Sequence, residues 1–438
     1  MLDKVKSAGI TGAGGAGFPA HIKLGAKAQS YIINAAECEP LLATDRTLML
    51  NFSKEIIEGI KAVREITPYE KAYIGIKEKN RDCGEALKKF IDVDFIEVRV
   101  LRNVYPSGDE QVMIYEILDK VVPEAGIPLD IDVIVNNVET VYRIGKAVLQ
   151  DEPFSKRFVS IIGEVNNPQV REVPVGTSFS YLLDIAGKKD IDYVAIDGGP
   201  MMGKVVEVNE GIVRKTTSGI IFLERDHPLI RRKTQTIKSV VSQARASCCN
   251  CMTCTELCSR YLIGHRMEPH KIMRAIGMEL TQPHVYEHAM LCSECNICEL
   301  YACPIGLSPR AVNVKIKNEM RKEGKRFEKE RLKEYKAPVF RKGRQLNTTR
   351  LTARLGLSKY YSVKPEYITE ELKPDMLRIY LNQHIGAPAK AVVDIGNEIK
   401  ANQLIGKLSG DFSANVHSPL DGKVISKGEN YIDIEVRL

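Results

Sequence analysis

The chain has 438 residues, of which 44% are apolar, 27% charged and 6% aromatic, and it contains no tryptophan. This is the composition of a globular protein with two to four domains, and it excludes a chain that is disordered for most of its length. No apolar run approaches the roughly 18 residues needed to cross a bilayer. Because Met1 leads through a short polar segment into a glycine-rich loop, without an apolar signal, we expect a cytoplasmic protein.

The net charge of +7 is uneven along the chain, because residues 310–350 hold 15 Lys or Arg against 5 Glu. A solvated helix and linker would explain this basic stretch, and so would a docking face for an acidic partner. Only three aromatic residues accompany the positive charges in it. Base stacking needs more, so we expect no nucleic-acid partner.

Residues 1–155 alternate short apolar runs with amphipathic stretches. The apolar runs predict strands at 31–34, 72–76, 95–101 and 131–135. Between them, apolar residues at helical spacing predict helices at 54–66, 83–91 and 109–121. Such alternation is typical of a three-layer α/β domain.

This first domain opens with a glycine-rich loop, Gly12-Ala-Gly14-Gly15-Ala-Gly17-Phe18-Pro19. The spacing contains a formal GxGxxG, but the residues before it are polar and Pro19 interrupts the expected helix start, so a Rossmann fingerprint is poorly matched. Its backbone amides can still cradle a phosphate or lie against a planar ring, because glycine permits close approach. A simple flexible loop is the alternative.

Three further polar segments, at 34–40, 105–110 and 136–140, follow predicted strands or precede a predicted helix. Each alone is explained by turn and capping chemistry. Ligands of α/β sheets bind beyond the carboxyl ends of the strands, where such segments meet. Together with the glycine-rich loop, they predict the mouth of a cofactor site.

Residues 156–228 are different, with short β-rich pieces around one expected helix at 180–186 and frequent Gly and Pro. This pattern predicts a small mixed β domain of the grasp type. Residues 238–335 follow as a cysteine-rich region and a basic helix, and 336–382 form a loosely patterned linker. Residues 383–438 again show short strands and resemble a lipoyl-type barrel-sandwich hybrid, although no Asp-Lys hairpin is present to carry a lipoyl group.

Nine of the eleven cysteines lie between Cys248 and Cys303, a clustering that points to metal in a reducing compartment. They form two motifs, Cys248-x2-Cys251-x2-Cys254-x3-Cys258 and Cys292-x2-Cys295-x2-Cys298-x4-Cys303-Pro304. In two-cluster ferredoxins, three closely spaced thiolates bind one [4Fe–4S] cluster and the fourth cysteine of each motif serves the other. We therefore predict a first cysteine set of Cys248, Cys251, Cys254 and Cys303, and a second cysteine set of Cys292, Cys295, Cys298 and Cys258.

A pair of zinc sites is the alternative, but a third cysteine two residues beyond a CxxC pair has no role in tetrahedral zinc coordination. Two features depart from the ferredoxin pattern. Ser259 instead of proline follows Cys258, and four residues instead of three separate Cys298 from Cys303. Cys249 is an alternative ligand to Cys248, but only one residue separates it from Cys251, so we do not assign it to a cluster.

The segments GAGGAGFPAHIKL, NAAECEP, YPSGDE and NNVET resemble the flavin- and NADH-binding subunit of respiratory complex I and the RnfC component of Rnf complexes. The segments 196–203 and 215–219, together with the ferredoxin motifs, are most similar to the PduS family of propanediol-utilisation cobalamin reductases. The resemblance implies a multidomain α/β fold with a complex-I-like FMN-binding domain, a β-grasp domain of the SLBB type, a helical dicluster ferredoxin domain and a C-terminal barrel-sandwich hybrid.

The resemblance also implies the cofactors, which are FMN, two [4Fe–4S] clusters and NADH as electron donor. The implied cofactor-binding residues are Gly12, Gly14, Gly15, Gly17, Phe18, Lys23, Asn34, Glu37, Glu39, Glu110, Asn136 and Asn137. Lys23 would lie near the FMN phosphate, whereas NADH would stack near Phe18 with Glu39 and Glu110 at its polar groups. One departure is Ala36, where complex I has Asp, which removes a carboxylate from the expected site.

The function implied is an NADH-dependent oxidoreductase that reduces the cobalt of cobalamin through FMN and both clusters, in or at a bacterial microcompartment. Cobalamin, a corrinoid-dependent enzyme or an adenosyltransferase would then be partners, with a shell protein or ferredoxin as further candidates. The alternative is a relay between NADH and a ferredoxin or membrane partner, as in Rnf complexes. No acid–base triad is needed for either reaction, and the sequence shows none.

Overall fold

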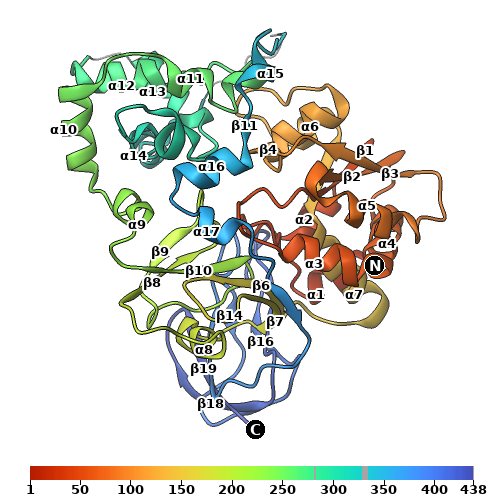
Figure 1. Cartoon of the computed structure of the whole chain (residues 1–438). Coiled ribbons are helices and arrows are strands. Elements are labelled where there is room, and N and C mark those ends of the chain that lie inside the picture. Colours follow the sequence, from red (N-terminus) through yellow and green to blue (C-terminus); the bar gives the residue numbers. More distant parts are fainter. Residues whose placement is uncertain (281–282, 328–333, 438) are drawn as a thin grey trace.

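The computed structural model describes residues 1–280, 283–327 and 334–437, and it builds them around five β-sheets (Figure 1). Figure 1 shows the N-terminal α/β part beside the cysteine-rich helices, with the β-rich middle and C-terminal parts below them. Among the described residues, no helix is both long enough and apolar enough to span a membrane.

The N-terminal part contains a four-stranded parallel sheet in the order β3-β2-β1-β5. Its strands are β1 (Ser30–Ala35), β2 (Lys71–Lys77), β3 (Ile96–Leu101) and β5 (Val133–Asn137). Both faces of the sheet are covered, because Ile33 of β1 packs into one apolar cluster and Ile32 into another. A parallel strand buried on both faces is apolar at successive positions, which is why sequence pattern located these strands.

Helices cover this sheet on both faces, as the alternation predicted. Helices α4 (Ser53–Ile66) and α7 (Val138–Gln150) contribute to the larger cluster, and α6 (Glu110–Leu118) contributes to the smaller one. Helices α4 and α7 cross closely, since a Cβ added at Gly59 would lie 2.5 Å from the Val141 carbonyl oxygen. The remaining helices are α1 (Leu2–Ser7), α2 (Ala20–Leu24), α3 (Thr44–Asn51) and α5 (Arg81–Lys88).

The next part is a six-stranded mixed sheet in the order β12-β7-β6-β10-β8-β9. Its strands are β6 (Lys156–Gly163), β7 (Gln169–Pro174), β8 (Tyr193–Asp197), β9 (Lys204–Val206), β10 (Gly219–Glu224) and β12 (Glu366–Ile368), and α8 (Phe179–Ile185) packs on it. Helix α9 (Pro228–Lys233) leads out of this part toward the cysteine-rich region.

The cysteine-rich region is helical around its loops. Helices α10 (Ile237–Ser247), α12 (Pro269–Gly277) and α14 (Pro309–Lys322) share one apolar cluster, to which α13 (Pro283–Glu287) also contributes. A short helix, α11 (Thr253–Glu256), lies inside the first cysteine motif. The sequence pattern predicts a basic helix that continues to about residue 335. In the structure this helix, α14, ends at Lys322, and residues 328–333 lie outside the described part of the chain.

Residues 336–382, expected as a linker, contain several short elements that pair with distant parts of the chain. Strand β11 (Leu346–Asn347) pairs with β4 (Val104–Tyr105), and β12 pairs with β7. Helices α15 (Arg341–Arg344), α16 (Thr348–Arg354) and α17 (Ser358–Tyr361) lie between the linker's start and β12 in sequence. Elements of two to seven residues are too short for apolar periodicity to reveal them.

The C-terminal part contains two small antiparallel sheets around one apolar core. One has the order β13-β19-β18-β15 and the other β14-β16-β17. The strands are β13 (Met376–Tyr380), β14 (Lys390–Ala391), β15 (Glu398–Ile399), β16 (Leu404–Lys407), β17 (Val416–His417), β18 (Gly422–Lys427) and β19 (Tyr431–Val436). Strand β13 precedes residue 383, where the sequence pattern places the start of this domain.

The C-terminal part packs against the start of the chain. The Ile385 backbone N–H donates to the Gly17 carbonyl at 3.0 Å, and Asn415 Nδ2 donates to the Ser7 carbonyl, also at 3.0 Å. The rings of Phe18 and Phe412 meet edge to face with centroids 6.0 Å apart. The glycine-rich loop is therefore held in part by residues near the other end of the sequence.

Candidate functional site

A cavity of about 340 Å³, called here the main cavity, lies at the carboxyl ends of β1 and β5 beside the glycine-rich loop. This volume is in the usual range for small-molecule and cofactor sites. Ten of the residues expected to bind cofactors line it: Gly12, Gly14, Phe18, Lys23, Asn34, Glu37, Glu39, Glu110, Asn136 and Asn137. In the sheet, Asn34 and Asn137 are register partners, which explains how segments a hundred residues apart meet there.

Gly15 and Gly17, also expected to bind cofactor, shape the loop instead of lining the main cavity. Both have positive φ, of +101° and +66°, a conformation that favours glycine. The loop is fixed from its other side, because the Ala13 N–H donates to Thr140 Oγ1 at 2.9 Å.

The Ala13 carbonyl accepts a hydrogen bond from the guanidinium of Arg157, at 2.6 Å. Arg157 is 2% exposed and also donates to the Thr217 carbonyl and to Glu139, which is 1% exposed. Glu139 in turn accepts from the Phe158 N–H and pairs with Arg143. This buried network joins α7, β6 and the glycine-rich loop. Sequence reasoning missed Arg157, because nothing in its local pattern distinguishes it from a surface arginine on a strand.

Lys23 supplies a cationic nitrogen at the main cavity. Its Nζ donates to the Val135 carbonyl at 2.8 Å and lies 3.2 Å from a Glu110 carboxylate oxygen, and a quarter of the side chain is exposed. The amine is thus held at the end of β5, near the N-terminus of α6, with part of its surface open.

The acidic residues of the 34–40 segment are largely occupied by protein partners. The Glu37 carboxylate accepts from Thr44 Oγ1 and from the backbone N–H groups of Asp45 and Arg46 at the start of α3. The Glu39 carboxylate accepts from the Met201 and Met202 N–H groups, each at 2.8 Å, and burial raises its pKa. Glu39 therefore joins the main cavity to the β8–β9 turn.

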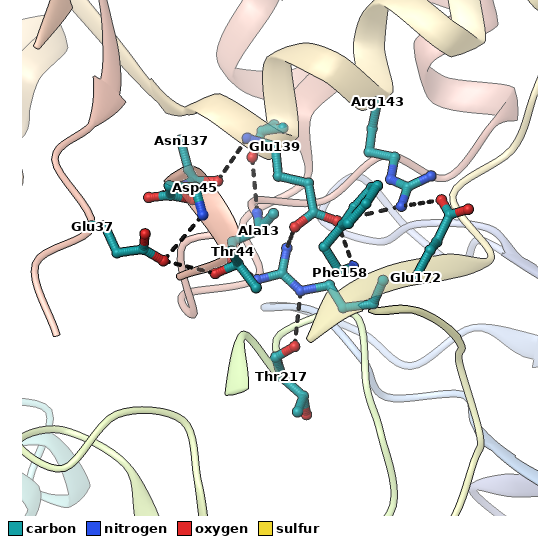
Figure 2. A network of polar contacts seen from close by, with 12 residues as sticks. Ala13, Glu37, Thr44, Asp45, Asn137, Glu139, Arg143, Phe158, Glu172 and Thr217 are labelled. Atoms are coloured by element: carbon teal, nitrogen blue, oxygen red, sulfur yellow. Dashed lines mark hydrogen bonds and ion pairs between the residues drawn. The ribbon is translucent and has the colours of Figure 1, made fainter. Parts of the chain in front are cut away.

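Asp45 is a cavity residue that sequence reasoning did not single out. Its carboxylate accepts from Asn137 Nδ2 at 3.2 Å (Figure 2), and burial together with Glu37 raises its pKa. The main cavity therefore keeps a carboxyl group despite Ala36. Only the place of Asp45 at the start of a helix that follows the 34–40 segment could have drawn attention to it.

The lining of the main cavity fits a flavin nucleotide. Gly12 and Gly14 leave the loop backbone bare of side chains, and Lys23 offers a cation for a phosphate. Asn34 also lines the cavity, with its amide nitrogen bonded to the Gly108 carbonyl. Leu42, Val135 and Pro106 add apolar surface for a ring system. A cavity that combines apolar walls with a few convergent polar groups is typical of cofactor binding.

Each of the two cysteine sets lines its own cavity, so the structure groups the cysteines in the way that their spacing predicts. One cavity is lined by Cys248, Cys251, Cys254 and Cys303, and Cys249 also borders it. The other is lined by Cys258, Cys292, Cys295 and Cys298. Within the described ranges, no three His, Cys, Asp or Glu side chains are arranged to hold a single metal ion. Each cavity thus brings together four thiol groups, the number of protein ligands that a [4Fe–4S] cluster takes.

The two sets differ in exposure and in their neighbours. Cys249 and Cys251 at the first set are exposed, whereas Cys295 and Cys298 of the second set are buried. Cys295 also lines the main cavity, and its carbonyl accepts from the Tyr105 hydroxyl at 2.7 Å. The second cysteine set therefore borders the candidate flavin site directly.

Histidines near the cysteines contact protein groups. His265 Nε2 lies 2.8 Å from the Val122 carbonyl oxygen, and burial lowers the pKa of this histidine to about 4. His265 thus helps to attach the cysteine-rich region to the N-terminal part.

Comparisons with known families divide the chain in the same order. Residues 5–146 match the Nuo51 FMN-binding domain family, 247–308 the 4Fe-4S dicluster domain family, and 355–433 the RnfC barrel sandwich hybrid domain family. The α/β fold class and its FMN-binding, dicluster and barrel-sandwich parts are thereby confirmed. FMN and two [4Fe–4S] clusters are the cofactors of these domains, and the chain is an oxidoreductase.

Among curated proteins, the chain is similar over nearly its whole length to two proteins named cobalamin reductase PduS. That of Salmonella typhimurium is 38% identical over 99% of this chain and 96% of its own, and that of Citrobacter freundii is also 38% identical over the same shares. A component of the Na(+)-translocating ferredoxin:NAD(+) oxidoreductase complex of Acetobacterium woodii is 34% identical over 59% of this chain and 57% of its own.

Proposed function

The chain belongs to the PduS family, and from this premise we propose that it uses NADH to reduce the cobalt of a cobalamin. The glycine-rich loop and Lys23 would hold FMN at the main cavity, where it would supply hydride acceptance from NADH, and clusters held by the two cysteine sets would supply one-electron transfer. The observation that carries the proposal is the position of Cys295, which lines both the main cavity and the cavity of the second cysteine set. Electrons thus have a short route from flavin to cluster.

The residues of the main cavity position the substrates under this proposal. The glycine-rich loop, held by Thr140 and Arg157, presents bare backbone to the flavin, and Lys23 neutralises the phosphate. Phe18 at the edge of the cavity offers an aromatic face for the nicotinamide. Glu37 and Glu39 shape the site through the backbone groups that they bind.

The first cysteine set is the better placed of the two to deliver electrons outward. Cys251 and its neighbour Cys249 are exposed, and Met252 and Ile305 beside them are 40% and 48% exposed. We expect a free corrinoid, a corrinoid-dependent enzyme or an adenosyltransferase to accept electrons on this side. Association with a bacterial microcompartment is part of the same proposal.

The test is an anaerobic assay of the FMN- and iron-replete protein with NADH and hydroxocobalamin, followed by visible absorption. We expect loss of the cob(III)alamin bands with turnover, and no such loss without FMN or in Cys295→Ala. Cys83→Ala, which removes a buried cysteine outside both sets, is the matched control and should retain turnover. Absence of any bleaching by NADH would overturn the proposal at its first step.

A relay to another protein is the second candidate, and the similarity to a component of a ferredoxin:NAD(+) oxidoreductase complex favours it. Bleaching of flavin and clusters by NADH without corrinoid reduction would support this candidate. Adding a ferredoxin to the same cuvette then asks whether a protein accepts the electrons. Cys251, the exposed member of the first cysteine set, lies on the side that would serve either acceptor.

A further inference from the structure

Ser259 immediately follows Cys258, at the position where the bacterial ferredoxin pattern has proline. Its side chain is 3% exposed, and its hydroxyl donates to Cys295 Sγ at 3.7 Å. The hydroxyl therefore links the backbone next to Cys258 to the sulfur of Cys295, and both cysteines belong to the second set. Proline has no hydrogen-bond donor and would leave this sulfur without that contact.

The segment that carries Ser259 is fixed to the wall of the main cavity. Arg260, the next residue, is 9% exposed and donates to Asp109 Oδ1 at 2.6 Å. The same Asp109 oxygen accepts the Gln111 and Val112 N–H groups and so caps α6. On the other side of Ser259, the Cys258 carbonyl accepts the Leu262 N–H at 2.9 Å, so the backbone that carries the hydroxyl is held at both ends.

A hydrogen bond to a ligating sulfur acts on the reduction potential of a cluster. Reduction adds one negative charge, which spreads onto the sulfurs and strengthens any hydrogen bond that they accept. The bond therefore stabilises the reduced form more than the oxidised form. In a buried site water cannot replace the lost donor, so the effect of one hydroxyl is large.

We propose that Ser259 is a positioning residue that raises the reduction potential of the cluster held by the second cysteine set, and so favours entry of electrons beside Cys295. The inference rests on the proposed function, because it takes the second set to hold a [4Fe–4S] cluster. Each passage moves one electron and breaks no bond in the protein. Two passages carry away the pair of electrons that one hydride of NADH delivers.

The test is a potentiometric titration of both clusters in the complete protein, followed by electron paramagnetic resonance. In Ser259→Ala we expect the reduced-to-oxidised ratio of one cluster to fall about tenfold at a fixed applied potential, equivalent to about 59 mV for a one-electron couple. Ser259→Thr keeps the hydroxyl and should restore the parent value. Iron content checks that every variant carries both clusters.

The first cysteine set offers a matched control, since Thr253 Oγ1 lies 3.3 Å from Cys251 Sγ. Thr253→Ala should shift the other cluster signal by a smaller amount, because water can replace the donor at exposed Cys251, and should leave the Ser259-sensitive signal in place. The inference is overturned if Ser259→Ala shifts neither signal, or if both variants shift the same one. Protein that contains flavin but no clusters would instead contradict the proposed function itself.

Discussion

Lys23 is a residue that the resemblance predicts at the cofactor site and that the structure places at the main cavity. The resemblance assigned it to the FMN phosphate, and its Nζ lies at the main cavity with part of its surface open. The grouping of the cysteines in two cavities also follows the sequence pattern, because cluster binding restricts the spacing of its ligands. The role of Arg157 could not be predicted from the sequence, because it depends on partners that only the folded chain brings together: Glu139, Ala13 and Thr217.

Replacing Lys23 by methionine should weaken FMN binding about 10- to 100-fold. A charge-assisted hydrogen bond to phosphate contributes about 1.5–3 kcal/mol, and methionine keeps the apolar stem without the charge. Fluorescence titration of the apoprotein with FMN measures the affinity. Lys27→Met, at an exposed lysine four residues away, is the control and should bind FMN as the parent does. Equal affinity in both variants would remove Lys23 from the phosphate site.

Among the elements, the parallel strands were predictable and the short strands of residues 346–380 were not. Strands β1, β2 and β5 are buried on both faces and therefore have continuous apolar runs. By contrast, β11 has two residues and β12 three, and each is defined by a partner strand far away in sequence. The 34–40 segment was correctly placed at the cavity, but the direction of its carboxylates depends on α3 and on the β8–β9 turn.

Helix α3 depends on Glu37 for its first turn. Glu37→Gln should lower the free energy of unfolding by about 1–2 kcal/mol, because an uncharged amide binds the Asp45 and Arg46 N–H groups less strongly at a helix N-terminus. Urea denaturation measures this change. Glu58→Gln removes an exposed carboxylate from an i,i+3 pair with Lys61 and should cost less than about 0.5 kcal/mol. If Glu37→Gln lowers the free energy of unfolding as little as Glu58→Gln does, Glu37 does not cap α3.

The junction of α7 with β6 depends on Arg157. Arg157→Leu should destabilise the protein by about 3–5 kcal/mol, because it leaves the buried Glu139 carboxylate with less compensation. The midpoint of thermal unfolding reports the loss. Arg225→Leu, at an exposed arginine that pairs with Glu207 and Asp192, should leave the midpoint close to that of the parent. Similar midpoints for the two variants would show that the buried network contributes little.

At the scale of the whole molecule, the order of the domains followed from the resemblance, but their mutual contacts did not. Lys215 is the clearest example, since it is 1% exposed and its Nζ donates to the Gly9 carbonyl at 2.8 Å and the Asn415 carbonyl at 2.9 Å. It thereby joins three parts of the chain. A contact between residues so far apart in sequence leaves no trace in local periodicity.

This buried amine should make stability depend on pH. Burial lowers the pKa of Lys215 from its ordinary 10.5 to about 7 in the folded chain. Between these values the unfolded chain binds more protons, so stability rises with pH through this window, by at most about 1.4 kcal/mol per pH unit, and levels off below it. Nearby His417, whose pKa burial lowers to about 3, stays neutral throughout.

Lys215→Met should lower the slope of stability against pH in this window, whatever its effect on stability at a single pH. Urea denaturation across the window, at roughly pH 7, 8 and 9, compares the slopes of the parent and the variant. Lys400→Met, at an exposed lysine, should keep the slope of the parent. Parallel slopes in the parent and Lys215→Met would show that the amine has the same proton affinity in the folded and unfolded chains.

The contacts between the glycine-rich loop and the C-terminal part also set an order of events during synthesis. Gly17 leaves the ribosome long before Ile385, the residue whose N–H binds its carbonyl. At about 5–20 residues per second, the delay is roughly 20 to 70 s. During that interval the nascent loop lacks part of its support, so the nucleotide site is completed only near the end of translation. We therefore expect flavin to be incorporated late in the maturation of this protein.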